Sequence, residues 1–265
     1  MLFTLLSLIG LSYAAPTPDA AARGERLAGL AGCEACHTAP EGTPYAGGYA
    51  IDTSFGTFYG SNLTPDPVNG LGQWTEQDFG EALRHGTGPD GLRYWPAFPF
   101  DSFTHLSDDD VGDLWAYLQN LPPSVTPNKA HAVSRGRWQL RFWRLLAFHP
   151  RGALPQRPHR SAEWLRGQYL ANAVGHCGGC HTPRGAIGGM RSGKYLQGTD
   201  DPPESSPDIS ELGWSTDEWL DLLDLGMLPD GNFVGKQMSR VVEHGTSKLT
   251  PSDRKAIAAY MLDLP

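Results

Sequence analysis

Apolar residues recur with helical spacing in two pairs of segments that lie far apart in the chain. The first pair covers Gly24 to Gly32 and Gly167 to His176, and in both segments the apolar residues share one face of a helix. The second pair carries shorter apolar stripes, formed by Leu114, Tyr117 and Leu118 in one copy and by Ile257, Tyr260 and Met261 in the other. The pattern predicts four amphipathic helices in two matching pairs.

Helix start signals precede both members of the second pair. Ser107 is followed three residues later by Asp110, and Thr250 is followed by Pro251 at the first helical position and by Asp253. A hydroxyl at the N-cap and an acid at the third helical position satisfy backbone N–H groups that the helix leaves unpaired. We expect helices to begin directly after Ser107 and Thr250.

The matching pairs belong to a longer internal repeat. Trp74 is followed by Pro89-Asp90-Gly91, and Trp214 is followed by Pro229-Asp230-Gly231, with a Trp-to-Gly spacing of 17 in each copy. The repeat predicts two domains, at 15–122 and 161–265, joined by a linker at 123–160.

The helix at the start of each copy leads into the same pentapeptide pattern, Cys-x-x-Cys-His. Cys33, Cys36 and His37 form the first motif, and Cys177, Cys180 and His181 form the second. The two motifs use all four cysteines of the chain. Two cysteines one helical turn apart can attach a haem covalently, and the adjoining histidine then becomes an axial ligand to iron. The sequence therefore predicts two covalently bound haem c groups. Disulfides or a four-cysteine zinc site are the alternatives, although neither needs a histidine after each pair.

Composition fits domains that fold around a cofactor. The chain contains 32 Gly and 22 Pro, which suit long loops between short helices. Helices that lead into the haem motif and close the domain resemble the class I cytochrome c fold. We expect an all-α protein of two tandem class I cytochrome c-like domains, each wrapped around one haem.

The two copies differ at the position expected to supply a second axial ligand. Met238 lies seven residues after Gly231, and a thioether there would close the second haem. The corresponding residue, seven after Gly91, is Phe98, which cannot bind iron. The first haem is therefore either open or closed by another group. The candidates are His85, His105, His131, His149 and His159, with Asn62, Tyr59 and Lys129 as weaker choices.

Several further segments resemble the cytochrome c subunits of bacterial membrane-bound alcohol and gluconate dehydrogenases. They are Phe55 to Pro67, Gly70 to Gly86, Tyr94 to Phe100, His176 to Gly185, and the closing residues from Leu249. The resemblance implies electron transfer from a periplasmic or membrane-bound dehydrogenase to the respiratory chain, with a quinol/oxidase chain or another cytochrome as acceptor. Such subunits usually carry three haems, so this chain resembles a dihaem relative. The resemblance also implies an axial methionine where this chain has Phe98.

Two classes of function remain open at this point. The first is a dihaem electron carrier or dehydrogenase subunit that is not an independent enzyme, in which Met238 gives the second haem the higher potential. The second is a peroxidase-like enzyme or gas-binding protein with an open first haem, for which His85 would be the distal acid-base group. A purely structural or docking module is a third, weaker interpretation.

Charge patterning restricts the partners. The net charge of −8 disfavours nucleic acid, which would require a basic face. The linker contrasts with the rest of the chain, because residues 122–160 hold eight Lys or Arg and no acid. Within it, residues 135–148 predict a basic amphipathic helix, which either packs over the domain interface or contacts a partner or a membrane surface.

The first 14 residues form an apolar run that ends in Ser12-Tyr13-Ala14. The run is too short to span a bilayer and its end suits signal peptidase, so we expect a signal peptide at 1–14 and a periplasmic location. Because no Lys or Arg precedes the run, an uncleaved anchor or a misassigned start remains an alternative.

Overall fold

The structure, a computed structural model, describes residues 18–53, 55–133, 136–148, 150, 152–155, 157–185, 188–200 and 205–264. The expected signal peptide and His149 lie outside the described residues. The first half of the chain contributes helices α1 (Pro18–Leu30), α2 (Cys33–His37), α3 (Glu76–His85), α4 (Phe100–Phe103) and α5 (Asp108–Gln119). Strands β1 (Ala50–Thr53) and β2 (Gly56–Tyr59) form a hairpin, to which β3 (Ala132–Val133) adds an antiparallel edge.

The second half repeats this order after the linker helix α6 (Arg137–Ala147). It contains α7 (Ala162–Tyr169), a π-helical turn at Leu170–Val174, α8 (Gly178–His181), α9 (Thr216–Leu225), α10 (Lys236–His244) and α11 (Pro251–Leu262), with 3-10 turns at Ser192–Lys194 and Thr246–Lys248. Strands β4 (Gln197–Thr199) and β5 (Ser206–Asp208) pair antiparallel. Helices dominate both halves, as expected, and the small sheets are additions that the sequence pattern did not predict.

The first and last helices of each half cross at a glycine. A Cβ atom at Gly24 of α1 would lie 1.9 Å from the carbonyl oxygen of Asp113 in α5, and one at Gly167 of α7 would lie 1.8 Å from the carbonyl oxygen of Ala256 in α11. Only glycine allows the helix backbones to approach so closely. The two halves therefore share one crossing geometry, which confirms the internal repeat.

The predicted helix starts are confirmed. Ser107 accepts a hydrogen bond from the backbone N–H of Asp110, and Thr250 accepts one from that of Asp253, with Pro251 at the first helical position. Helices α3 and α9 begin with full capping boxes at Thr75 and Ser215. Local side-chain chemistry thus fixes where each repeat's helices begin.

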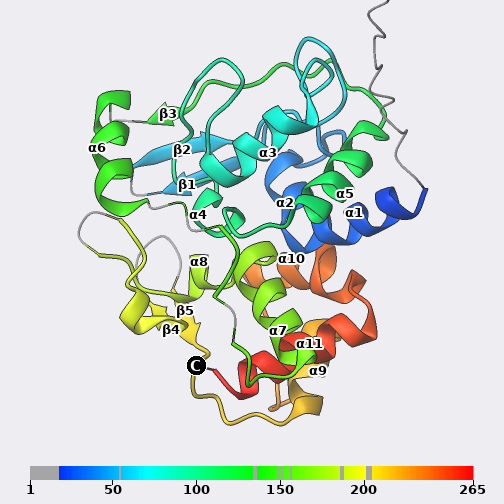
Figure 1. Ribbon diagram of the computed structural model, residues 1–265, viewed down its shortest axis with the longest axis vertical. Helices are drawn as coiled ribbons and strands as arrows, with labels where there is room; N and C mark the ends of the chain where they lie inside the picture. Colours follow the sequence, from blue (N-terminus) through cyan, green and yellow to red (C-terminus); the bar gives the residue numbers. More distant parts are fainter. Residues whose placement is uncertain are drawn as a thin grey trace, which may run out of the picture.

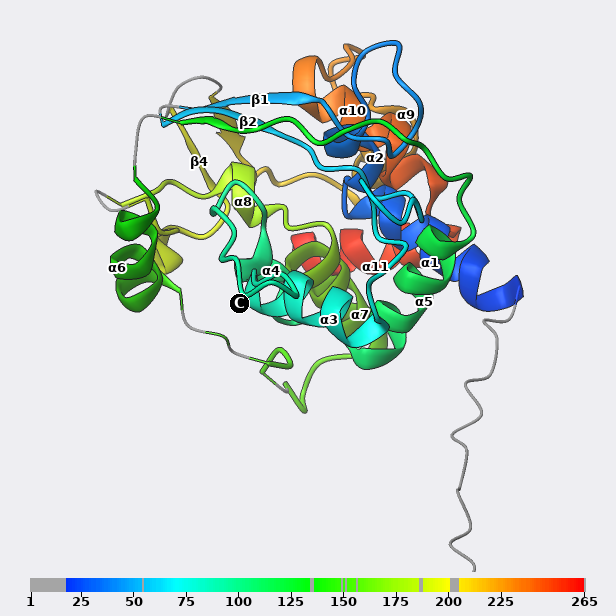
Figure 2. The same ribbon diagram turned by 90° about the horizontal axis from the view of Figure 1, so that it is seen from above.

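The two halves lie against each other and share one continuous cluster of buried apolar residues (Figure 1). Helix α10 of the second half packs on α1 and α2 of the first. Figure 2 shows the same arrangement from above, with α6 at the outer edge of the molecule. The two motif helices, α2 and α8, thus belong to one body.

Candidate functional site

The first Cys-x-x-Cys-His motif forms the short helix α2. Cys33 packs against the apolar core, and burial raises the pKa of its thiol to about 12. The Nδ1 atom of His37 donates a hydrogen bond of 2.7 Å to the carbonyl oxygen of Ser61. Gly60 makes this approach possible, because a Cβ atom there would lie 1.9 Å from the carbonyl oxygen of Cys36.

The second motif repeats these features. Cys177 packs against the core, and burial raises the pKa of its thiol to about 12. The Nδ1 atom of His181 donates a hydrogen bond of 2.9 Å to the carbonyl oxygen of Pro207. The four cysteines are not joined by disulfides, and the described residues hold no cluster of three or more His, Cys, Asp or Glu suited to a metal ion.

The histidine geometry fits an axial ligand to haem iron. A carbonyl oxygen can only accept, so Nδ1 of each imidazole carries the proton and Nε2 keeps its lone pair. Desolvation lowers the pKa of His37 and of His181, and each bond to a carbonyl opposes the shift. Both rings are therefore held neutral with Nε2 available, which is the state that binds iron.

The structure keeps the two repeats in register up to the position of the expected second ligand. Gly86 and Gly226 end α3 and α9 in the left-handed conformation, with φ of 56° and 73°. The same turn follows in both copies. The backbone N–H of Tyr94 donates to the carbonyl oxygen of Gly86, and the backbone N–H of Val234 donates to that of Gly226. Phe98 and Met238 follow Gly91 and Gly231 by seven residues each, but Phe98 lies in the loop before α4 and Met238 lies in the first turn of α10.

Aromatic rings surround Phe98. Its ring lies 5.9 Å from that of Tyr94 and 5.6 Å from that of Phe103, centroid to centroid. Burial raises the pKa of the Tyr94 hydroxyl to about 12, and Asp90 adds to the shift. Phe98 thus lies partly buried among aromatic rings, with His176 packed on one of these rings, that of Phe103, and Met238 lies partly buried in the first turn of α10.

The histidines considered for the first haem point elsewhere. The His85 side chain is 42 % exposed and its Nε2 lies 3.9 Å from Glu81 on the outer face of α3. His105 is hydrogen-bonded through Nδ1 to the carbonyl of Gly152 in the linker. His131 accepts from the backbone N–H of Tyr59, and His159 is exposed. None of these contacts places an imidazole beside Phe98.

The weaker candidates also have structural roles. Asn62 is 2 % exposed, and its amide donates to the carbonyls of Ser124 and Thr126 while its oxygen accepts from Thr64. The ammonium of Lys129 lies 5.6 Å from the centre of the Tyr59 ring. These side chains fasten the start of the linker to the first domain.

The two motifs meet across the domain interface, which sequence reasoning missed. His176, directly before Cys177, lies with its Nε2 atom 3.3 Å from the carbonyl oxygen of Ala31, two residues before Cys33. His176 has a φ of 38°, at the position where the first motif has Gly32 with a φ of 69°. The left-handed backbone conformation is uncommon and strained for a histidine. The contact with Ala31 therefore helps to hold His176 in an unfavourable conformation. Only that unusual histidine at a glycine position could have indicated it in the sequence.

A second link joins α10 to the first motif. Arg240 donates a 2.7 Å hydrogen bond to the carbonyl oxygen of Ala35 and stacks 4.6 Å from the centre of the Tyr49 ring. Desolvation raises the pKa of the Cys36 thiol, Arg240 lowers it, and Cys180 of the second motif raises it further. The pKa of the Cys36 thiol thus depends on groups of both domains, and Arg240 reaches the first motif directly.

Comparison with known proteins finds the same division of the chain into two repeats. The family model described as cytochrome c matches residues 21–122 and again residues 165–265, more than half of the chain. The chain belongs to the cytochrome c family. This cytochrome carries two covalently bound haem c groups, one at Cys33 and Cys36 and one at Cys177 and Cys180.

The cytochrome is similar to three curated proteins in particular. A dihaem cytochrome c-type protein of Cereibacter sphaeroides is 39 % identical over 92 % of this chain and 86 % of its own length. The cytochrome c subunit of a quinone-dependent alcohol dehydrogenase of Gluconobacter oxydans is 38 % identical over 92 % of this chain and 54 % of its own length. The cytochrome c subunit of gluconate 2-dehydrogenase of Pantoea cypripedii is 34 % identical over 100 % of this chain and 65 % of its own length. The cytochrome therefore spans between half and two thirds of these two dehydrogenase subunits.

These matches confirm the predicted resemblance, the two-domain cytochrome fold and the cofactor. They also support electron transfer as the work of this cytochrome, and two of the three relatives are named as subunits of dehydrogenases. Among the described helices, none is both long enough and apolar enough to cross a membrane.

Proposed function

We propose that this cytochrome is a periplasmic relay that takes electrons from a dehydrogenase and passes them between its two haems toward the respiratory chain. A haem c supplies reversible one-electron chemistry at its iron. The protein contributes ligands, an apolar setting for each haem, and the distance between the two. The observation that carries the proposal is the contact of the second domain with the first attachment site: His176, next to Cys177, reaches Ala31 near Cys33, and Arg240 of α10 binds Ala35 within the first motif.

In this proposal Cys33, Cys36, Cys177 and Cys180 anchor the haems, and His37 and His181 are the proximal ligands. The bonds from Nδ1 to Ser61 and Pro207 support these roles, because they fix each imidazole with Nε2 toward the porphyrin. Met238 is the sixth ligand of the second haem. Its equivalence to Phe98 in the repeat supports an unequal pair, in which only one iron has a thioether ligand of its own domain.

An unequal pair gives the electron a direction. Histidine with methionine raises the potential of a cytochrome c iron. With Met238 as a ligand, the second domain would be the acceptor side of the pair, and the first domain would receive electrons from the donor. The names of the relatives support a dehydrogenase as that donor, since several are subunits of alcohol, fructose and gluconate dehydrogenases. The acceptor is then a quinol/oxidase chain or another cytochrome.

The competing hypothesis of a peroxidase-like enzyme gains no support from the geometry. It requires an acid-base group over the first haem, and the candidate His85 is directed outward beside Glu81. The aromatic rings of Tyr94 and Phe103 flank Phe98, and His176, whose ring lies 5.6 Å from that of Phe103, is engaged by the carbonyl oxygen of Ala31. A mainly aromatic setting favours electron transfer over cleavage of a polar substrate.

One-electron pulse reduction of the holo protein tests the relay. A sub-stoichiometric pulse reduces whichever haem is more accessible, and the unequal ligand sets make the two haems spectrally distinct. We expect a second absorbance phase whose rate does not depend on protein concentration, because the electron redistributes within one molecule. A second phase whose rate rises in proportion to protein concentration would show that the haems exchange electrons only between molecules, and would overturn the proposal.

A further inference from the structure

Helix α6 presents an apolar stripe to the outside of the molecule. Trp138, Phe142, Leu145 and Leu146 follow one another at spacings of four, three and one residues, and their exposed fractions are 63 %, 60 %, 72 % and 63 %. These positions share one face of a helix. Monomeric soluble proteins rarely expose a contiguous apolar surface of this kind without an interaction to cover it.

The opposite face of α6 is fastened to both domains. Leu140 is 3 % exposed, and Trp143 packs edge-on against Phe100 with the ring centres 6.1 Å apart. Arg144 donates to the carbonyls of His85 and Gly86, and Gly189 of the second domain approaches Ala147. The linker helix therefore packs over both domains with its inner face, and it holds the outer stripe in a fixed orientation.

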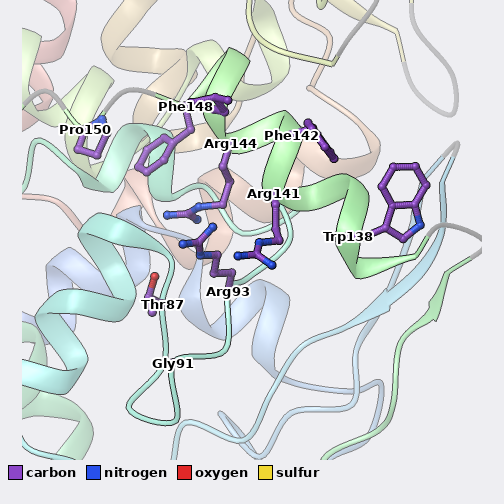
Figure 3. Close-up of a pocket in the computed structure, with 10 residues that line it drawn as sticks. Thr87, Gly91, Arg93, Trp138, Arg141, Phe142, Arg144, Phe148 and Pro150 are labelled. Carbon is purple, nitrogen blue, oxygen red and sulfur yellow. The ribbon is translucent and has the colours of Figure 1, made fainter.

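Three guanidinium groups gather beside the stripe. A pocket of about 780 Å³ opens between α6 and the loop from Thr87 to Arg93, and Arg93, Arg141 and Arg144 line it. Figure 3 shows these guanidinium groups side by side, with Trp138 and Phe142 directed away from them. The described residues that line this pocket include no Asp or Glu. Burial lowers the pKa of Arg144, and the nearby charge of Arg93 adds to the shift, so an anion in the pocket would relieve the repulsion.

We propose that α6 is a membrane-docking helix, which inserts its stripe of Trp138, Phe142, Leu145 and Leu146 into a bilayer surface while the arginine pocket binds the phosphate of an anionic phospholipid. Guanidinium groups match phosphate oxygens through paired hydrogen bonds. Helices that lie in the interface combine Trp, Phe and Leu on one side with basic residues beside them. The placement of α6 at the outer edge of the molecule in both ribbon views leaves it accessible to an extended surface (Figures 1 and 2).

A lipid surface fits this region better than an acidic protein does. The stripe is a row of large exposed apolar side chains, and Trp138, Phe142 and Leu145 of that row also line the arginine pocket. An acidic partner would supply carboxylates for the arginines and leave that row uncovered. A phospholipid brings phosphate and acyl chain together in one molecule. The chemistry of the pocket and of the stripe is then satisfied by a single type of ligand.

Vesicle binding by the holo protein tests the proposal. We expect sedimentation with vesicles of phosphatidylglycerol and phosphatidylcholine, no sedimentation with phosphatidylcholine alone, and weaker binding as salt is raised. Arg141→Gln should lower the partition coefficient about fivefold, as removal of one basic residue near an anionic surface does. The double change of Phe142→Ser and Leu145→Ser should lower it about tenfold or more, because two inserted side chains are lost.

Matched controls come from exposed residues elsewhere in the chain. Arg191→Gln removes an exposed arginine, and Val125→Ser removes an apolar side chain that is 80 % exposed. Both should bind like the parent, with the N-terminal segment the same in every protein. All variants should keep two haems per chain, because the changed residues lie at the surface.

Four outcomes would overturn the proposal. The parent protein could fail to bind the mixed vesicles, or the α6 variants could bind as well as the controls. Arg141→Gln could also leave vesicle binding unchanged and shift a haem potential, which would assign the arginines to haem propionates. A fourth contrary result is loss of binding to a dehydrogenase, with vesicle binding intact, in the Phe142→Ser and Leu145→Ser protein.

Discussion

Arg240 of the second domain donates a 2.7 Å hydrogen bond to the carbonyl oxygen of Ala35, which lies between the two cysteines of the first motif. The same helix, α10, carries Met238 two residues earlier. The element that offers a ligand to the second haem is thus fastened directly to the attachment site of the first. This contact is one of several that join the two domains into one body, together with the shared apolar cluster and the contact of His176 with Ala31.

Replacing Arg240 should weaken this interface. Arg240→Gln loses the bond to Ala35 and the stacking on Tyr49, and we expect the free energy of unfolding to fall by about 1 to 3 kcal/mol. We also expect the first haem to become harder to reduce, because a nearby cation stabilises the electron it gains. Denaturant unfolding and a redox titration measure the two effects.

Arg240→Lys separates charge from geometry. It keeps the positive charge but loses the planar donor group, so stability should fall while the potential of the first haem changes little. Equal unfolding midpoints for Arg240→Gln and an Arg191→Gln control would show that the interface does not depend on Arg240.

His176 offers a test of backbone strain and of electronic contact. With a φ of 38°, the residue occupies a conformation that glycine adopts freely. His176→Gly and His176→Ala both lose the contact with Ala31, but His176→Gly should be more stable than His176→Ala by about 1 kcal/mol. Thermal unfolding of the two variants checks this difference, and a more stable alanine variant would contradict the strain argument.

Both His176 variants should also slow electron redistribution between the haems. The bridge from Ala31 to the residue before Cys177 is lost, while His181, Met238 and their bonds remain. The absorption spectrum of each haem should therefore be unchanged. Unaltered redistribution rates in both variants would mean that the electron follows another route.

The close crossing of α1 and α5 predicts that one methyl group added at Gly24 lowers the stability of the protein strongly. Gly24→Ala would place Cβ 1.9 Å from the carbonyl oxygen of Asp113, so α1 and α5 must move apart. We expect a loss of about 1 to 3 kcal/mol in unfolding free energy, or more if the backbone cannot yield. Gly193→Ala is the matched control, because no atom lies within 4 Å of the added carbon. Similar stability for the two variants would argue against the close crossing.

Tyr169 makes the domain interface sensitive to alkaline pH. Its hydroxyl donates to the carboxylate of Asp110, and burial together with this bond raises the pKa of Tyr169 to about 12. The folded pKa lies above the ordinary tyrosine value of about 10. The contact therefore contributes fully to the free energy of unfolding below about pH 10, and this contribution is lost as the pH rises through about 12.

Tyr169→Phe should be less stable than the parent by about 1 kcal/mol at pH 8, where the hydrogen bond is intact. The difference should shrink as the pH rises through about 12. Unfolding free energies measured across this pH range check the prediction. A difference that stays constant, or grows, would exclude the link between Tyr169 and Asp110 as its cause.

The sequence was sufficient to predict those structural features that depend on residues close together in the chain. Ser107, Thr250 and Pro251 mark helix starts through short-range capping chemistry, and the structure confirms them. The equal spacings of the repeat likewise predicted the matching turns that end at Gly86 and Gly226 after α3 and α9, while the equivalence of Phe98 and Met238 stays a prediction. Each of these features depends on residues a few positions apart.

Long-range contacts were beyond sequence reasoning. The bond from Arg240 to Ala35 joins residues 205 positions apart, and no periodicity encodes such a pair. Residues 135–148 predicted an amphipathic helix, which the structure confirms for the described part, Arg137–Ala147. The sequence left open whether that helix covers the domain interface or a partner. The structure shows that Arg144 faces inward to the domains and Phe142 faces outward, so orientation required the tertiary fold.

An optical redox titration of the holo protein beside Met238→Leu tests the unequal haem pair most directly. Leucine keeps the apolar volume of the side chain and removes the thioether. We predict two separate one-electron steps in the parent, of which only the higher moves to lower potential in the variant, because only the second haem has methionine as a ligand. A variant titration identical to that of the parent, or one in which the lower step moves, would contradict the assignment of Met238 and with it the proposed direction of electron flow.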